Sequence, residues 1–313
     1  MTIAPTHFET VGAEAQTLLD YIRDEYPASW RIIEANIGRN PHLFADIANR
    51  AVGWASSHFG PSYVQILGDG YAHFLTDVNR EQLSYDKRGS YRNRSYDDVY
   101  KDVYDNDQYM QYYNWGVFAT TFLWEHHLRI YQFFIQAFVN HLQPDGNVIE
   151  LGSGSGIWSS LAASKTSGTT FTGIDISKSA VAVATSLSQA AGVDSRCTFK
   201  FGNALEFVHE GERFNAGLSC FLMEHLEAPQ MLIRKLAESV VPGGIIFLTA
   251  AITAAEVDHI YEFRSEGDVV AMLESNGLRV VKLLSATPQA DVRRRFLPRS
   301  VAVLAQVKQT AEW

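Results

Sequence analysis

A glycine-rich stretch near the middle of the chain constrains the fold more than any other feature. An apolar segment directly precedes Gly152, Gly154 and Gly156, which stand at alternate positions. Because glycine lacks a Cβ atom, the backbone here can turn sharply and lie directly against a ligand. The pattern predicts a short buried strand over 147–151, a tight turn, and a helix over 157–165.

Strands and helices are expected to alternate from this point to the end of the chain. The expected strands cover 147–151, 170–175, 196–201, 214–220, 245–250, 278–285 and 300–307. Helices are expected between them over 157–165, 177–191 and 265–276. Alternation of this kind is typical of an α/β fold in which a parallel sheet carries helices on both faces.

The preceding residues show helical periodicity and no convincing strand. Helices are expected over 13–26, 29–37, 41–59 and 61–83, the last interrupted at Gly68-Asp69-Gly70. A polar segment over 86–94 is expected to form a loop that could serve as the hinge of a lid. An aromatic helical stretch over 96–142 follows, which Asn114 and Gly116 are expected to break or kink. We therefore expect two domains, a helical lid and substrate-recognition region over 1–143 and a sheet domain over 144–313.

Spacing distinguishes between the kinds of glycine-rich loop. A dinucleotide-binding loop, G-x-G-x-x-G, would need glycine where Ile157 stands, and a phosphate-binding loop would need a following Lys-Ser/Thr pair. The chain has G-x-G-x-G behind Glu150 instead. A carboxylate at that position suits a ligand that carries an ammonium group. Asp175, at the end of the second strand, can accept hydrogen bonds from ribose hydroxyls, which does not separate the candidate ligands.

These residues resemble the first motif of the class I S-adenosylmethionine-dependent methyltransferases, usually written E/D-x-G-x-G-x-G. The resemblance implies a Rossmann-like sheet of seven mostly parallel strands with an antiparallel last strand. It also implies S-adenosylmethionine as the cofactor and S-adenosylhomocysteine as the product. It covers about 143–308 and does not reach the N-terminal helices, which decide the substrate.

Further segments match the same family. Asn203 stands where the family often has an Asp that holds the adenine amino group, and an amide oxygen can still accept that hydrogen bond. The segment 221–229 looks like the loop after the fourth strand, often written L-E-H-L-x-x-P, and Pro242-Gly243-Gly244 like the turn before the fifth. The cofactor-binding residues expected are Glu150, Gly152, Gly154, Gly156, Asp175, Ile176, Asn203, Ala204, Cys220, Tyr109 and Tyr112.

Tyrosines gather just before the first motif, in the segment that commonly covers the methionine end of the cofactor in such enzymes. Aromatic faces attract a sulfonium cation by about 0.5–2 kcal/mol each. On this reasoning Tyr109, Tyr112 and Tyr113 are candidates for a lid, and the alternative is that they belong to the core.

The candidates for acid–base catalysis are His225, His126 and Tyr113. His225 lies at the carboxyl edge of the sheet and is the best candidate for a base, although the family often uses this histidine structurally. His126 and His127 point roughly 100° apart on a helix, so they cannot both bind one metal ion from one face, and no metal site is expected. The segment 252–264 covers the same sheet edge, and the substrate contacts expected there and in the preceding loop are Glu224, Asp258, His259 and Tyr261.

Composition narrows the class of partner. With 26 basic and 35 acidic residues the net charge is −9, which argues against a nucleic acid as acceptor. Cys197 and Cys220 are far apart and read as buried free thiols. No apolar run approaches the roughly 20 residues of a membrane span. We expect a cytoplasmic enzyme with a small-molecule substrate and no membrane partner, and a homodimer is compatible with the sequence.

The function expected is methyl transfer to a nitrogen, oxygen or carbon atom of a small molecule by in-line displacement at the sulfonium methyl. One alternative is an enzyme that uses the aminobutyrate arm of the cofactor and releases methylthioadenosine. A second alternative is a non-catalytic partner protein that binds S-adenosylmethionine, and an NAD-dependent enzyme is a more distant third.

Overall fold

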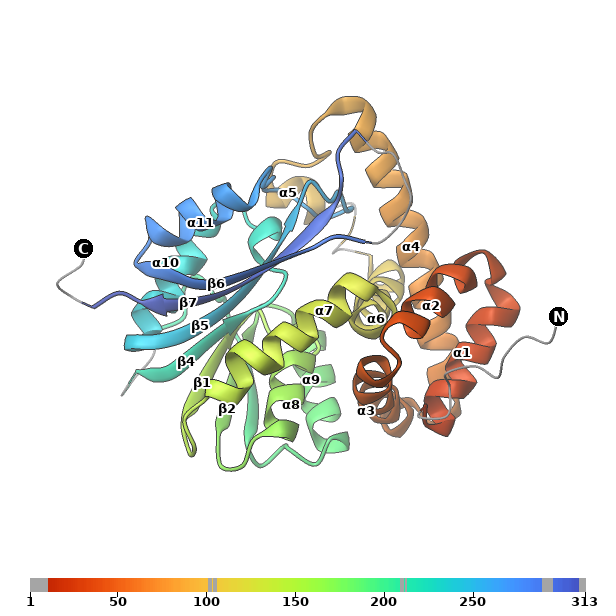
Figure 1. Cartoon of the computed structure of the whole chain (residues 1–313), viewed down its shortest axis with the longest axis horizontal. Coiled ribbons are helices and arrows are strands. Elements are labelled where there is room, and N and C mark those ends of the chain that lie inside the picture. Colours follow the sequence, from red (N-terminus) through yellow and green to blue (C-terminus); the bar gives the residue numbers. More distant parts are fainter. Residues whose placement is uncertain are drawn as a thin grey trace.

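The computed structural model describes residues 11–100, 103, 106–208, 211, 213–288 and 295–309. A seven-stranded sheet of order β3-β2-β1-β4-β5-β7-β6 forms the C-terminal half of this part of the chain (Figure 1). Its strands are β1 Asn147–Leu151, β2 Thr170–Asp175, β3 Cys197–Phe201, β4 Phe214–Ser219, β5 Val240–Ile252, β6 Leu278–Ala286 and β7 Arg299–Val307. Strands β1 to β5 pair in parallel, and β7 runs antiparallel to both β5 and β6. This confirms the predicted seven-stranded, mostly parallel, Rossmann-like sheet.

Helices cover both faces of the sheet, as predicted. One face carries α7 (Glu125–Phe133), α8 (Ile157–Lys165) and α9 (Lys178–Ala190), and the other carries α10 (Pro229–Ser239) and α11 (Glu266–Glu274) (Figure 1). The apolar residues of each strand alternate between the two faces: Val148 packs with the first set of helices, and Ile149 with the second. Because both faces are covered, the central strands β1 and β4 are mostly buried, whereas the edge strands β3 and β6 keep exposed residues.

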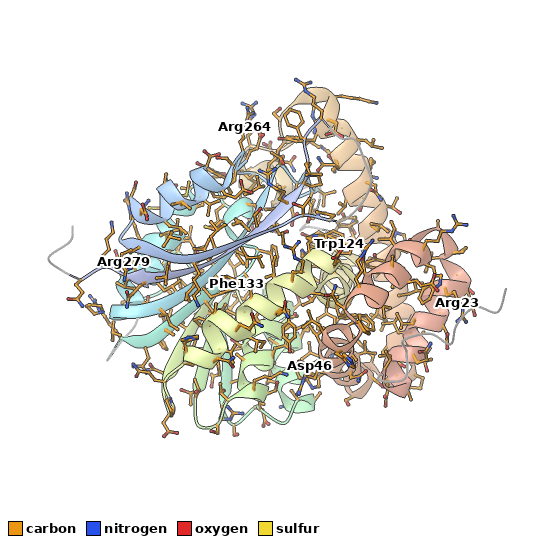
Figure 2. All side chains as sticks on the ribbon, in the orientation of Figure 1. Arg23, Asp46, Trp124, Phe133, Arg264 and Arg279 are labelled. Carbon is orange, nitrogen blue, oxygen red and sulfur yellow. The ribbon has the colours of Figure 1, made fainter. Side chains whose placement is uncertain are left out.

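The N-terminal region is helical, and its apolar core is continuous with one face of the sheet. Its helices are α1 Ala13–Glu25, α2 Pro27–Arg39, α3 Pro41–Phe59, α4 Tyr63–Arg88, α5 Tyr96–Val99 and α6 Asp107–Leu123. Trp124 stands at the junction of α6 and α7, where this region meets the sheet domain (Figure 2). No helix within the described ranges is long and apolar enough to cross a membrane.

The predicted interruption of the fourth helix is wrong, because α4 continues through Gly68 and Gly70. A Cβ atom on Gly68 would lie 2.6 Å from the ring of Tyr21, and one on Gly70 would lie 3.0 Å from the backbone nitrogen of Gly116. The glycines therefore allow helices to approach closely instead of breaking the helix. Asp69 between them accepts hydrogen bonds from the hydroxyls of Tyr21 and Tyr26.

The predicted break at Asn114 and Gly116 is also wrong. Helix α6 runs through both residues and ends at Leu123, and Trp124 adopts an extended conformation before α7 begins. A Cβ atom on Gly116 would lie 2.5 Å from the carbonyl oxygen of Gly70 in α4. Gly116 thus serves the crossing of α4 and α6, and the chain turns eight residues later.

Helix α4 and strand β5 each extend well beyond the bounds expected for them. Helix α4 extends to Arg88 and ends where Gly89 takes a left-handed conformation, so the predicted loop over 86–94 is shorter. Strand β5 begins at Val240, and its pairing with β4 shifts in register between Phe214 and Ala216. The segment Pro242-Gly243-Gly244 therefore lies at an irregularity within β5, where the sequence predicted a turn before it.

Candidate functional site

A cavity of about 1190 Å³ lies at the carboxyl ends of the strands. Strands β1 and β4 are neighbours while β2 lies on the other side of β1, so the strand order reverses here, which is where ligands of doubly wound folds bind. The glycine-rich loop and the loop after β4 line the cavity from the sheet domain. Residues of α4, α5 and α6 line it from the N-terminal region, so both parts of the chain enclose one space.

The three glycines of the loop all have positive φ angles but differ in what surrounds them. A Cβ atom on Gly152 would lie 2.4 Å from Leu222, and one on Gly156 would lie 2.6 Å from Phe199. A Cβ atom on Gly154 would meet nothing within 4 Å, and Gly154 lines the cavity. The backbone at Gly154 is therefore open to direct contact with a ligand. Gly156 is needed for packing and does not line the cavity.

Asp175 lies beside the glycine-rich loop. The backbone N–H of Gly154 donates to its Oδ2 atom at 2.8 Å, and that of Ser177 to Oδ1 at 2.9 Å. Burial raises the pKa of Asp175, and these two hydrogen bonds oppose that shift. A carboxylate can accept about four hydrogen bonds, so Asp175 retains the capacity to accept bonds from a ligand.

Glu150 is placed differently from the expectation. Its carboxylate accepts a hydrogen bond from the Ser159 hydroxyl of α8, is 1% exposed, and does not line the cavity. Burial raises its pKa to about 8. The expected direct contact between Glu150 and the ammonium group of a ligand is therefore not supported, and the side chain lies between β1 and α8.

The remaining residues expected on the nucleoside side do line the cavity, namely Ile176, Asn203, Ala204 and Cys220. The Asn203 side-chain oxygen accepts the backbone N–H of Leu205 at 3.0 Å, which fixes the orientation of the amide. Burial raises the pKa of the Cys220 thiol well above its ordinary value, so the thiol stays protonated. Ile176 is 58% exposed and lines the cavity, so a ligand bound there would cover it.

Tyr109 and Tyr112 do not line the cavity. The Tyr109 hydroxyl donates to Asp77 at 2.7 Å, and the Tyr112 ring stacks on His73 with centroids 4.6 Å apart. The structure thus gives no support to a cofactor role for either. Two tyrosines that sequence reasoning did not single out, Tyr96 and Tyr100, line the cavity and are 42% and 45% exposed.

A buried ion pair stands at the opposite side of the cavity. His225, in the 3₁₀ turn Met223–His225 after β4, has its Nδ1 atom 3.2 Å from Oδ2 of Asp258. The Tyr113 hydroxyl donates to the same oxygen at 2.6 Å. Burial by itself lowers the pKa of His225, but Asp258 outweighs this and raises it to about 10. Burial raises the pKa of Asp258, but the charge of His225 outweighs burial and holds this pKa well below its ordinary value.

The ion pair changes the expected role of His225. An imidazole with a pKa near 10 is protonated at neutral pH. It can then donate a hydrogen bond, but it has no lone pair with which to accept a proton. The geometry favours His225 as a donor that Asp258 orients.

Two further carboxyl groups lie beside this pair. Burial raises the pKa of Glu224 to about 7 and that of Glu256 to about 8. His259 lies between them, and burial lowers its pKa to about 3. Tyr261 does not line the cavity, and its backbone N–H donates to the Glu224 carbonyl oxygen at 2.9 Å. We call Glu224, His225, Glu256, Asp258 and His259 the carboxylate–histidine cluster.

His126 and His127 form part of an aromatic wall of the cavity. Trp124 stacks on His126 with centroids 5.0 Å apart, and His127 lies 4.9 Å from the ring of Phe221. Burial lowers the pKa of His127 to about 3 and that of His126 well below its ordinary value. Both rings are neutral at physiological pH and are weak bases, so this wall is aromatic and uncharged.

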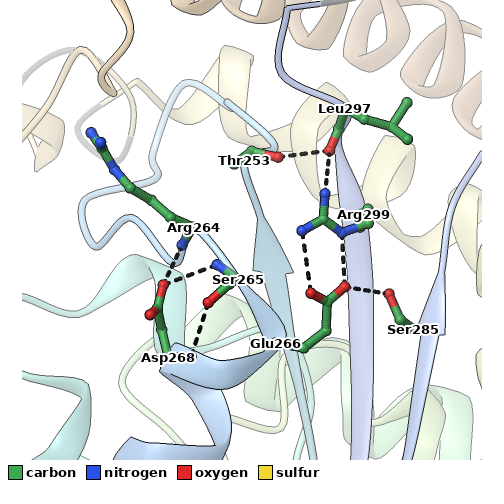
Figure 3. A network of polar contacts seen from close by, with 8 residues as sticks. All are labelled: Thr253, Arg264, Ser265, Glu266, Asp268, Ser285, Leu297 and Arg299. Carbon is green, nitrogen blue, oxygen red and sulfur yellow. Dashed lines mark hydrogen bonds and ion pairs between the residues drawn. The ribbon is translucent and has the colours of Figure 1, made fainter.

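The loop that carries Asp258 and His259 is anchored at both ends. Thr253 donates to the Leu297 carbonyl, and Ser265 caps α11 by exchanging hydrogen bonds with Asp268 (Figure 3). Figure 3 also shows Arg299 bound through two nitrogens to Glu266. These contacts hold both ends of the loop in a fixed position relative to the sheet.

The N-terminal helices hold the same loop from the other side. The backbone N–H of Ala255 donates to the Gln82 side chain at 2.9 Å, and the Gln82 amide donates to the Thr253 carbonyl at 3.2 Å. The Asn93 amide donates to the Val257 carbonyl at 2.6 Å. The loop after β5 is thus bonded to α4 and to the segment that follows it.

Comparison with known proteins identifies the sheet region. Residues 148–244 match the model of a methyltransferase domain family. The chain therefore carries a class I methyltransferase domain, for which S-adenosylmethionine is the cofactor. The match covers the glycine-rich loop, Asp175, Asn203 and His225.

Individual related proteins align with only part of this chain and at low sequence identity. Ajmaline N-methyltransferase of Rauvolfia serpentina is 27% identical over 173 residues, which are 53% of this chain and 54% of that protein. A ubiquinone biosynthesis O-methyltransferase of Azorhizobium caulinodans is 30% identical over 102 residues, 33% of this chain and 39% of that one. The chain thus spans about half or less of the length of these relatives. The solved structure of the [4+2]-cyclase SpnF aligns with a TM-score of 0.49 at 14% identity, covering 77% of this chain and 96% of that chain.

Proposed function

We propose that this protein transfers the methyl group of S-adenosylmethionine to a small molecule bound in the same cavity. The observation that carries the proposal is the shared space itself. Gly154 and Asp175 line it on one side, and the carboxylate–histidine cluster lines it on the other. Methyl transfer needs the nucleophile, methyl carbon and sulfur in line and water excluded, and a cavity enclosed by both regions of the chain can supply both.

The size of the cavity fits two molecules. Its volume of about 1190 Å³ lies above the range of roughly 300–1,000 Å³ that holds a single small ligand. The aromatic wall of Trp124, His126, His127 and Phe221 gives the acceptor side an apolar surface. We therefore expect a largely apolar acceptor.

The chain's residues have distinct roles in this proposal. Gly154 leaves room for the cofactor against the backbone, and Asp175 can accept hydrogen bonds from the ribose hydroxyls. S-adenosylmethionine supplies an activated methyl group when bound. Asp258 orients His225 toward the acceptor side, where Glu224 and Glu256 have pKa values near neutrality and can take up a proton that the acceptor loses. Both curated relatives are named as methyltransferases, one for nitrogen and one for oxygen.

Two measurements test the proposal. Calorimetric titration with S-adenosylhomocysteine should show binding at one site per chain. Incubation with S-adenosylmethionine and a panel of small acceptors should release S-adenosylhomocysteine only when an acceptor is present. Release of methylthioadenosine would instead indicate use of the aminobutyrate arm, and binding without any product would indicate a non-catalytic partner protein. No binding of either nucleoside would remove the basis of the proposal.

A further inference from the structure

The carboxylate–histidine cluster contains more hydrogen-bond acceptors than it has donors to satisfy. Its members come from two loops at the carboxyl edge of the sheet, the 3₁₀ turn Met223–His225 and the loop after β5. All of them line the cavity.

The tautomer of His259 follows from its neighbours. Its Nδ1 atom lies 2.7 Å from the Ala254 carbonyl oxygen, which can only accept, so Nδ1 carries the hydrogen. In the neutral ring the Nε2 atom then presents a lone pair. That atom lies 3.6 Å from Oε2 of Glu256, which is also an acceptor when ionised. When Glu256 is ionised, two acceptors therefore lie 3.6 Å apart, and a donor placed beside them can reach both.

Glu224 supplies a third acceptor. The side chain is 1% exposed, and its Oε2 atom has no hydrogen-bond partner in the described part of the chain. The carboxylate offers a ligand atom within 4.8 Å of one from His259. A buried carboxylate oxygen without a donor is costly, so this position calls for a ligand that donates.

The balance of charges in the cluster also favours a ligand that donates hydrogen bonds. Asp258 is already paired with His225, which leaves Glu224 and Glu256 without a matching cation in the cluster. Burial is the largest cause that raises the pKa of both groups and Asp258 adds to it, while the charge of His225 opposes the shift without cancelling it. A cationic ligand that donates hydrogen bonds would allow both carboxyl groups to ionise.

Building on the methyltransferase function proposed above, we infer that the acceptor is a basic amine whose ammonium group is held by Glu224 and His259, with Glu256 beside His259. An ammonium group supplies several donors and a positive charge, which match the unpartnered oxygen of Glu224, the Nε2 lone pair of His259 and the negative charge of the cluster. The apolar remainder of the amine lies against the aromatic wall.

A metal ion fits this cluster less well. The two groupings whose ligand atoms all lie within 4.8 Å are Glu224–His225–His259 and Glu256–Asp258–His259. Each therefore includes one member of the His225–Asp258 ion pair. An imidazolium has no lone pair for a metal, and Asp258 already accepts the Tyr113 hydroxyl. An ammonium group needs neither residue and leaves the pair intact.

The same carboxylates prepare the nitrogen for reaction. The ammonium group transfers one N–H proton to a carboxylate, which becomes a carboxylic acid, and the nitrogen regains its lone pair. The lone pair forms a C–N bond to the methyl carbon as the S–C bond breaks, and the sulfonium sulfur becomes a thioether. The product nitrogen is again cationic, so the total charge is conserved.

The test compares amines with neutral molecules of the same shape. The probes are phenethylamine with 2-phenylethanol, tryptamine with tryptophol, and 4-phenylpiperidine with 4-phenyltetrahydropyran. Each is titrated calorimetrically at millimolar concentration into the full chain saturated with S-adenosylhomocysteine. We expect at least one amine to bind about tenfold or more tightly than its neutral partner.

Variants then locate the amine. Glu224→Gln keeps the shape and should weaken amine binding about tenfold or more while changing the neutral partner little. Glu227→Gln is the matched control, because Glu227 also lines the cavity but binds the backbone N–H of Tyr96 outside the cluster. It should leave amine binding unchanged. Thermal unfolding of both variants checks that each is folded.

The outcomes are distinct. If S-adenosylhomocysteine fails to bind the wild-type chain, the methyltransferase proposal falls and the amine assignment with it. If it binds but no amine is preferred over its neutral partner, or Glu224→Gln and Glu227→Gln act alike, only the amine assignment falls. Stoichiometric binding of Zn²⁺ or Mn²⁺ that Glu224→Gln abolishes would likewise overturn it, in favour of a metal site.

Discussion

Substitution of Gly154 by alanine separates the folding role of the glycine-rich loop from its binding role. Gly154 has φ +50°, and a Cβ atom there would meet nothing within 4 Å. The substitution should therefore lower the free energy of unfolding only by the cost of a left-handed alanine, about 1–2 kcal/mol. A ligand that lies against this backbone would meet the new methyl group, and we expect the dissociation constant for S-adenosylhomocysteine to rise at least about tenfold.

Gly192 provides a matched control for this experiment. It lies after α9, has φ +66°, also has open space around its Cβ position, and does not line the cavity. Gly192→Ala should lower the free energy of unfolding by a similar amount, about 1–2 kcal/mol, and leave the affinity unchanged. Urea unfolding and calorimetric titration measure the two quantities separately. Equal affinities for the two variants would show that Gly154 does not face the cofactor.

Three further predictions concern binding, packing and pH. Asp175→Ala should weaken the binding of S-adenosylhomocysteine by about 1–3 kcal/mol, because charge-assisted hydrogen bonds to the ribose are lost. Calorimetric titration measures this, and an unchanged affinity would contradict the placement of the ribose at Asp175. Gly116→Ala places a Cβ atom 2.5 Å from the backbone oxygen of Gly70 and should destabilise the chain by about 1–3 kcal/mol. Gly38→Ala, where nothing lies within 4 Å, should be neutral or slightly stabilising in the same denaturant experiment. Burial raises the pKa of Glu266, but hydrogen bonds and the charge of its partners outweigh burial and lower the pKa to about 2. The contribution of Glu266 to the free energy of unfolding is therefore complete above the unfolded pKa of 4.5 and fades as the pH falls toward 2. Glu266→Gln should therefore lower stability at pH 7 more than at pH 3, and equal losses would refute the assignment.

The fold could be predicted from the sequence because its signals are local. Apolar runs that end in glycine or a carboxylate mark β1 and β2, and covered parallel strands leave such runs in any chain. The placement of Asp175, Ile176, Asn203 and Ala204 at the carboxyl edge followed from strand ends alone. These residues lie beside one cavity because parallel strands bring their carboxyl ends to the same edge.

Glycines were harder to interpret where two helices cross. A glycine in a helical pattern indicates either a break or a close approach, and local sequence does not distinguish the two. Gly70 and Gly116 prove to be partners across α4 and α6, 46 residues apart in the chain. Only the packing of the two helices, which is a long-range property, decides between the readings.

The protonation state of the site was also beyond the sequence. Asp258 lies 33 residues from His225 and 145 from Tyr113, so no spacing reveals that these side chains meet. Their contact favours a role for His225 as a charged donor rather than as the base expected from the sequence. Burial raises the pKa of Glu224, which was expected only as a substrate contact, to about 7 and that of Glu256, which was not among the expected site residues, to about 8.

The hydrogen bond between Tyr113 and Asp258 links the two regions of the chain at the point where chemistry is proposed. Tyr113 belongs to α6, whereas Asp258 belongs to the loop after β5, and the Gln82 and Asn93 side chains bind that loop as well. Because a buried carboxylate is oriented by its donors, the position of the ion pair depends on how the N-terminal helices sit on the sheet. The helical region therefore does more than shape the space for an acceptor. It also fixes the charged groups that the acceptor would meet, so recognition and reactivity cannot vary independently in this fold.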